Sequence, residues 1–139
     1  MDKDFQKYKD NKKSFKRYLA SFKYAFNGVR YAFYHEKNLI IMFIIAILVF
    51  VLGIVLNISY VERLIIVLII GLLMALELIN TAIENVTNLA SMKQDENAKL
   101  AKDCASGAVA IIVIFAIIVG LMIFIPRIME LLQKWKAAL

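Results

Sequence analysis

Cysteine, histidine and proline are almost missing from this sequence of 139 residues, which contains one of each. A single cysteine, Cys104, has no partner for an internal disulfide, and one histidine with one cysteine makes no zinc cluster. The phosphate-binding pattern Gly-x-x-x-x-Gly-Lys-Ser/Thr does not occur either. These absences exclude a disulfide-stabilised scaffold, a zinc domain and a soluble P-loop enzyme.

Long apolar runs are what the sequence has in excess, since 62% of its residues are hydrophobic and its mean hydropathy is +0.72. The runs cover residues 39–56, 64–90 with polar interruptions, and 104–125, where Pro126 ends the last run. At about 1.5 Å per residue, eighteen residues or more reach roughly across a hydrocarbon layer of about 30 Å. A soluble bundle would need polar helix faces that these runs do not offer. We therefore predict one all-α integral membrane domain with three transmembrane helices.

The positive charges are concentrated at one end of the chain. Residues 1–37 hold ten of the 17 Lys and Arg residues, and the loop at 91–103 adds three more. By the positive-inside rule, the N-terminus and this loop are expected on the cytoplasmic face of the cell membrane. A basic segment directly before a membrane span more simply meets anionic lipid or a phosphorylated ligand than nucleic acid. We therefore expect no nucleic-acid partner.

The basic segment itself divides into two parts. Residues 1–13 lack apolar periodicity and are expected to be irregular. From Ser14 onward, aromatic and aliphatic residues recur three and four positions apart with basic residues between them. This pattern predicts an amphipathic helix in the plane of the membrane interface, and periodicity alone leaves open that it is only an anchor.

A stripe of polar residues interrupts the second apolar run. Glu77, Asn80, Glu84 and Asn88 follow one another at spacings of three and four, so they lie on one helical face. A carboxylate in or near hydrocarbon is costly unless it is paired, protonated or bound to a metal, and it therefore marks a candidate functional site. The alternative is a hydrogen-bonded contact that holds two membrane helices together.

Three polar residues at the start of the third run, Lys102, Asp103 and Ser106, are expected to face this stripe. The second and third spans are antiparallel, so Lys102 and Asp103 come beside Glu84 at the cytoplasmic end. Taken alone, Lys102 would be interpreted as a cation that reaches from the end of a helix to the interface. Glu36 lies at the entry of the first span on the same side of the membrane.

Together these residues predict phosphoryl transfer at the cytoplasmic membrane surface. Carboxylates at an interface suit Mg²⁺, which takes oxygen ligands and bridges phosphates, and neighbouring cations suit the remaining phosphate charge. Glu77 lies about two turns deeper than Glu84, where a carboxylate shielded from bulk water can accept a proton from a hydroxyl that arrives through the bilayer. The residues therefore fit a water-borne phosphate donor and a membrane-borne alcohol.

Three motifs carry a resemblance to a known family: GVRYAFYHEKN at 28–38, ALELINTAIENV at 75–86 and AKDCASGAV at 101–109. With these motifs the chain resembles the small prokaryotic diacylglycerol kinases, and more closely their Gram-positive branch, whose members act as undecaprenol kinases. The resemblance covers the chain from about residue 14. The segment SMKQDENAKL at 91–100 departs from the family pattern, so no nucleotide contact is carried over to it.

The resemblance implies a homotrimeric, ATP-dependent lipid kinase in which Glu77 is the general base. It implies that Glu36 and Glu84 hold Mg²⁺ against the ATP phosphates. It also implies two groups of contacts by position in this sequence: nucleotide contacts at Arg17, Tyr24, Glu36, Glu84, Lys102 and Asp103, and lipid contacts at Glu77, Asn80 and Ser106. Arg17 and Tyr24 are placed by counting back from the GVR motif without a gap.

Two other classes of membrane protein compete with a lipid kinase. A small ion or proton transporter would use Glu77 and Glu84 as a relay, but the stretches 64–76 and 111–125 contain no ionisable residue to continue the path. A membrane adaptor would recruit partners through its basic helix but would not require carboxylates in a span. The preferred acceptor is undecaprenol, which would give undecaprenyl phosphate, and the alternative is diacylglycerol, which would give phosphatidic acid.

Overall fold

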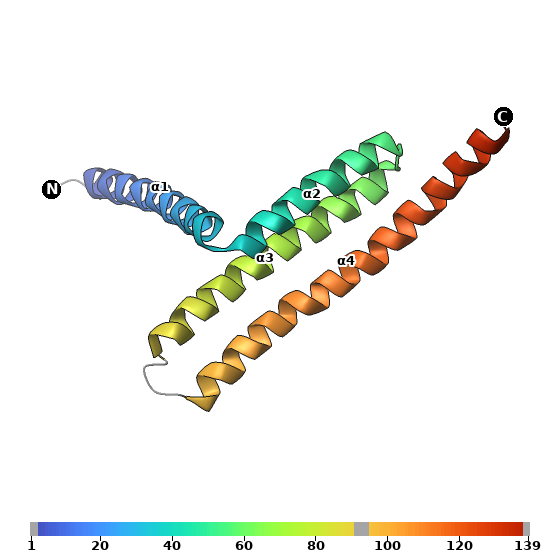
Figure 1. Cartoon of the computed structure of the whole chain (residues 1–139). Coiled ribbons are helices and arrows are strands. Elements are labelled where there is room, and N and C mark those ends of the chain that lie inside the picture. Colours follow the sequence, from blue (N-terminus) through green and yellow to red (C-terminus); the bar gives the residue numbers. More distant parts are fainter. Residues whose placement is uncertain (1–2, 91–94, 138–139) are drawn as a thin grey trace. The chain divides into compact units, whose positions relative to one another are not determined.

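The computed structural model describes residues 3–90 and 95–137, with side chains described for 15–89 and 95–137. The described chain is helical throughout apart from short connections (Figure 1). Its helices are α1 (Lys3–His35), α2 (Lys37–Val55), α3 (Tyr60–Ala90) and α4 (Glu96–Ala137). Two compact units divide between Glu36 and Lys37, so α1 and the three-helix unit are described separately.

The first unit is the single helix α1. It begins at Lys3, so the expectation of an irregular segment is wrong for residues 3–13, and residues 1–2 lie outside the described residues. The segment lacks apolar periodicity, but it contains no Gly or Pro, and Lys and Gln have good intrinsic helix propensity. From Phe15 onward most side chains of α1 are exposed, including its aromatic ones apart from the half-buried Phe33. Its location in the membrane interface stays a prediction.

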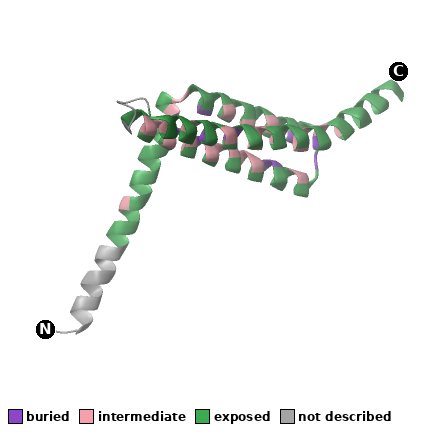
Figure 2. Cartoon of the chain, turned by 90° about the horizontal axis from the view of Figure 1, so that it is seen from below, coloured by how far each residue is buried: buried purple, intermediate pink, exposed green. Residues whose placement is uncertain are grey.

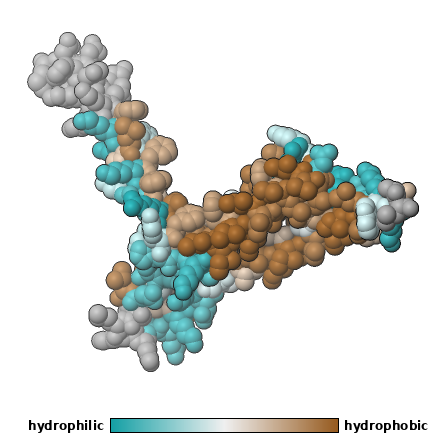
Figure 3. Space-filling model, turned by 45° about the horizontal axis from the view of Figure 1, so that its top comes forward, coloured by the Kyte–Doolittle hydropathy of each residue, from teal (hydrophilic) through white to brown (hydrophobic). Residues whose placement is uncertain are grey.

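The second unit contains the three candidate membrane spans. Each of α2, α3 and α4 is long and apolar enough to cross a bilayer, in agreement with the sequence prediction of three spans. Figure 3 shows polar side chains at the two ends of this unit and an apolar band between them. Most apolar side chains in the band are exposed in the isolated chain, as expected for a surface that contacts lipid.

Helix α3 is the central element of the second unit, because it packs along both α2 and α4. The helices alternate in direction, and a small core of Ile58, Ile66 and Ile123 joins them near the α2–α3 turn. Figure 2 shows that buried residues form a narrow line along the facing sides of the helices. The large apolar surface is therefore directed outward.

The turn between α2 and α3 is fixed by local hydrogen bonds. Asn57 has a φ of 50°, and the Ile58 amide donates to the Gly53 carbonyl at 3.1 Å, which is a Schellman ending. Ser59 and Glu62 then form a capping box: the Ser59 amide donates to Glu62 Oε2 at 2.6 Å and the Glu62 amide to Ser59 Oγ at 3.3 Å. The spacing Ser59-x-x-Glu62 in the sequence is the usual signal for such a capping box.

Helix α4 is longer at both ends than the predicted run of 104–125. It begins at Glu96 because Asp95 caps it, with the Asn97 amide donating to Asp95 Oδ1 at 2.8 Å. The expectation that Pro126 ends this helix is wrong, since α4 continues to Ala137. Proline removes one backbone hydrogen bond, but a long apolar helix tolerates this loss. As a result Lys102 and Asp103 lie inside α4 and not at its start.

Candidate active site

Two buried polar side chains lie one turn apart on α3. Glu77 is 3% exposed and Thr81 is 5% exposed, and they are the buried polar residues of the described chain. Residues four apart share a helical face, so both belong to the face that carries Asn80 and Glu84. A carboxylate placed this deep is protected from bulk water. Thr81 was not predicted as a site residue, although its distance of four from Glu77 was a usable signal.

The next level of the site joins α3 to α4. Ser106 Oγ lies 3.5 Å from Asn80 Oδ1, which is longer than a usual hydrogen bond between two oxygen atoms and makes this at most a weak polar contact. Asn80 is half-buried and Ser106 is exposed, so the two polar groups lie at the edge of the helix pair. The structure therefore brings together the two residues that were predicted to contact the lipid hydroxyl.

An ion pair lies one turn closer to the polar end. Lys102 Nζ is 3.7 Å from Glu84 Oε1, with side-chain exposures of 43% and 27%. The antiparallel packing predicted from the sequence is thereby confirmed at this level. An ion pair this open to water contributes little to stability, so its presence beside Glu77 and Asn80 needs another reason.

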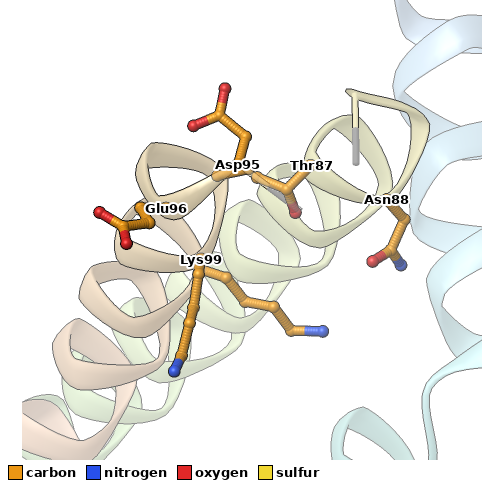
Figure 4. Close-up of a pocket in the computed structure, with 7 residues that line it drawn as sticks. Thr87, Asn88, Asp95, Glu96 and Lys99 are labelled. Carbon is orange, nitrogen blue, oxygen red and sulfur yellow. The ribbon is translucent and has the colours of Figure 1, made fainter. Parts of the chain in front are cut away.

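Beyond the ion pair, a pocket of about 600 Å³ opens between the end of α3 and the start of α4 (Figure 4). It is lined by Thr87, Asn88, Asp95, Glu96, Ala98, Lys99 and Lys102. This volume is in the usual range for small-molecule sites, about 300–1,000 Å³. Sequence analysis missed most of this lining, because the pocket depends on α4 beginning at Glu96. Lys102 lies both in the ion pair and in the pocket wall.

A second, apolar groove of about 630 Å³ lies between the three helices of the second unit. Its walls include Met42 and Val49 from α2, Ile70 from α3 and Val119 from α4, and Asn38 is the one polar residue among those that line it. A groove of this composition suits a hydrocarbon chain.

The predicted residues of α1 belong to the first unit. Arg17 and Tyr24 are exposed, and Glu36, directly after α1, is half-buried. Asp103 is exposed on α4 next to Lys102. The grouping of Arg17, Tyr24 and Glu36 with Glu84 stays a prediction.

A metal site built from protein ligands alone needs several donor side chains close together. Over residues 15–89 and 95–137, no three His, Cys, Asp or Glu side chains come together. Mg²⁺ does not need such a cluster, since it commonly binds one or two carboxylates together with waters and substrate phosphates. Glu84, a half-buried carboxylate at the polar end of the site, fits this kind of shared coordination.

Comparison with known proteins gives a consistent assignment. The family model described as prokaryotic diacylglycerol kinase matches residues 23–124. An undecaprenol kinase of Bacillus subtilis (strain 168) is 37% identical over 119 residues, which are 86% of this chain and 97% of that protein. A diacylglycerol kinase of Synechocystis sp. is 38% identical over 115 residues, 82% of this chain and 66% of that protein. The chain belongs to the prokaryotic diacylglycerol kinase family of membrane lipid kinases.

Proposed function

We propose that this protein transfers the γ-phosphate of Mg²⁺-ATP to the hydroxyl of undecaprenol, giving undecaprenyl phosphate and ADP. The observation that carries the proposal is the ladder on α3 and α4: buried Glu77, then Asn80 beside Ser106, then Glu84 beside Lys102 at the polar end. These residues extend from the buried, apolar surroundings of Glu77 to the charged, water-exposed end at Glu84 and Lys102. A lipid alcohol and a nucleotide can meet along this ladder.

Glu77 is the proposed general base. The hydroxyl oxygen attacks the γ-phosphorus, the bond from this phosphorus to the β,γ-bridging oxygen breaks, and ADP leaves with the electron pair. The hydroxyl proton goes to the Glu77 carboxylate. Because this carboxylate is 3% exposed, bulk water does not compete with the lipid hydroxyl as its proton donor. Asn80 and Ser106, on the adjoining level, orient the hydroxyl.

The charged level binds the phosphates. Lys102 would exchange its weak pair with Glu84 for a phosphate oxygen, and Glu84 and Glu36 are the carboxylates that would hold Mg²⁺. The bound ion would neutralise charge on the phosphate oxygens. Because phosphoryl transfer passes through a loose transition state, positioning and charge neutralisation supply most of the catalysis. Arg17, Tyr24 and Asp103 are proposed to complete the nucleotide contacts.

The acceptor lies with its tail in the apolar groove of the second unit. Undecaprenol is favoured because the Bacillus relative named for this substrate aligns over 97% of its length. Diacylglycerol is the second candidate, because the Synechocystis relative is named a diacylglycerol kinase at 38% identity. The protein is further proposed to be a homotrimer of the cell membrane, with its N-terminus and its active site on the cytoplasmic side.

The test is transfer of label from γ-labelled ATP by the purified protein in mixed micelles that offer undecaprenol and diacylglycerol together. We expect Mg²⁺-dependent label in undecaprenyl phosphate. Label mainly in phosphatidic acid would favour the second candidate, and label in neither lipid would contradict the proposal. Glu77→Gln is expected to lower turnover by at least about 10²-fold with assembly unchanged. Glu130→Gln, a carboxylate change elsewhere on α4, is the matched control.

A further inference from the structure

Helix α4 extends well past the length that a membrane span requires. Its 42 residues correspond to roughly 60 Å, about twice the thickness of the hydrocarbon layer. The family model ends at residue 124, so the part of α4 after this position lies outside the region matched to the family. We call residues 126–137 the α4 extension; it lies at the end of the unit that is opposite to the Glu84–Lys102 pair.

The α4 extension has two faces of different character. Its apolar residues are exposed: Ile128 43%, Met129 54%, Leu131 49%, Leu132 52% and Trp135 64%. Ile128, Leu132 and Trp135 recur at spacings of four and three, as along one face of a helix. Arg127 and Lys134, seven apart, lie on another face, and Arg127 is paired there with Glu62 of α3.

The apolar face continues the side of α4 that is turned away from α3. Buried Ile123 marks the side packed in the core, and at about 100° per residue Ile125 and Leu132 lie on the opposite side. Farther back along this outward side, Ile114 and Ile118 are exposed as well. In a bilayer this side of α4 contacts lipid. The apolar face of the α4 extension continues the same lipid-contacting side.

The chemistry of the extension selects the partner. It contains three cations, Arg127, Lys134 and Lys136, against one carboxylate, Glu130. Basic residues next to a membrane are attracted to anionic head groups, and tryptophan favours the head-group level. Pro126 cannot donate the hydrogen bond to the carbonyl four residues before it, so α4 bends most easily at this point.

We propose that the α4 extension docks on a bilayer surface that contains anionic lipid, on the side of the membrane opposite to Glu84 and Lys102. On docking, α4 bends at Pro126 and lays the face of Ile128, Leu132 and Trp135 on the head-group layer. Lys136, at the edge of this face, contacts the lipid phosphates, and Lys134, on the other face, adds to the longer-range attraction of the extension to the anionic surface. This docking is independent of the proposed lipid kinase activity.

Trp135 is the one tryptophan of the chain, so the fluorescence of the unmodified protein reports on this segment alone. The full-length protein is reconstituted in vesicles of phosphatidylcholine and phosphatidylglycerol that carry bromine either near the carbonyl groups or near the chain ends. We expect strong quenching by the shallow bromines, weaker quenching by the deep ones and little quenching by aqueous acrylamide. Strong acrylamide quenching without bromine quenching would overturn docking, because Trp135 would then stand in water. Protection from both quenchers would overturn it in favour of a second copy or another protein.

The role of charge is tested in the same vesicles. Lys134→Gln with Lys136→Gln is expected to weaken docking by about fivefold per cation removed, and omission of phosphatidylglycerol should have a similar effect. Leu132→Ser should reduce shallow-bromine quenching, whereas Gln133→Ser, the matched change on the polar face, should not. If quenching of Trp135 by shallow bromines stays unchanged both in the double lysine variant and in vesicles without phosphatidylglycerol, the extension does not recognise anionic lipid and the proposal is overturned. None of these residues belongs to the proposed active site.

Discussion

The Lys102 ammonium lies 3.7 Å from the Glu84 carboxylate, across the contact between α3 and α4. The pair is half-open to water, and its Lys102 side chain also lines the pocket between these helices. Under the proposed function, a nucleotide phosphate would replace Glu84 beside the Lys102 ammonium, and Mg²⁺ would replace Lys102 beside the Glu84 carboxylate. We therefore propose that the ion pair is the resting state of the phosphate site.

Removing the cation of this pair tests its role toward the nucleotide. Lys102→Met is expected to raise the KM for ATP about tenfold or more, because a charge-assisted hydrogen bond contributes about 1.5–3 kcal/mol. The KM for the lipid should be unchanged in the same micelle assay. Lys134→Gln, a cation removed from the other end of α4, is the control. An equal rise in both KM values would argue against a phosphate contact.

Removing the carboxylate tests the metal. Glu84→Gln keeps the size of the side chain but loses the charge that Mg²⁺ prefers, so the Mg²⁺ concentration for half-maximal activity should increase several-fold. Chelation by EDTA should abolish activity in the native protein, and added Mg²⁺ should restore it. The measurement is a Mg²⁺ titration at saturating ATP. A titration curve identical to that of the native protein would remove Glu84 from metal binding.

The contact between Asn80 and Ser106 predicts coupled effects on the lipid acceptor. Asn80→Ala and Ser106→Ala should each raise the KM for the lipid alcohol, while the KM for ATP stays constant. Because the two side chains are 3.5 Å apart, the double variant should deviate from additivity by about 0.5 kcal/mol or more. Strict additivity in this double-mutant cycle would show that the two residues act independently.

A larger residue at Gly53, before the α2–α3 turn, is expected to lower the stability of the fold without acting directly on the candidate active site. A Cβ atom at Gly53 would lie 2.8 Å from Ile58 Cδ1, and Ile58 is 1% exposed. Gly53→Val should therefore destabilise the fold by about 1–3 kcal/mol, as overpacking does, and lower the Tm in detergent. At Gly71 a Cβ meets nothing within 4 Å, so Gly71→Ala is the control. An unchanged Tm for Gly53→Val would mean that Ile58 moves aside freely.

Much of the fold followed from the sequence because apolar runs of membrane length allow few alternatives. The ends of the helices did not follow, since they depend on local contacts. Asp95 starts α4 eight residues or more before the apolar run, and Pro126 is passed without a break. Periodicity of apolar residues predicted the helix from Ser14 onward but not its first part from Lys3, where intrinsic propensity suffices for a helix.

The site could be predicted in part for a related reason. Spacings of three and four placed Glu77, Asn80 and Glu84 on one face of α3, and antiparallel packing placed Lys102 opposite, as the structure shows. The pocket of Asp95, Glu96 and Lys99 could not be predicted, because it exists only once the start of α4 is known. The roles expected of Arg17, Tyr24 and Glu36 rest on the family resemblance and stay predictions.

The pair of Glu62 and Arg127 predicts a salt-sensitive link at the end of the unit opposite to the active site. Arg127 Nη2 lies 3.3 Å from Glu62 Oε2, and Glu62 already accepts from the Ser59 amide, so the pair connects the start of α3 with α4. Glu62→Gln and Arg127→Gln should each lower the Tm by less than Gly53→Val does, and the decrease in Tm of the double variant should be smaller than the sum of the two single decreases.

The coupling between these two substitutions should depend on salt. Since salt screens exposed charges, it should decrease between low and high ionic strength. Glu130→Gln, which removes the other carboxylate near Arg127, is the matched control and should have a smaller effect, because its side chain is 56% exposed. Coupling that is absent at low salt would show that α3 and α4 are held in register by the core of Ile66 and Ile123 alone.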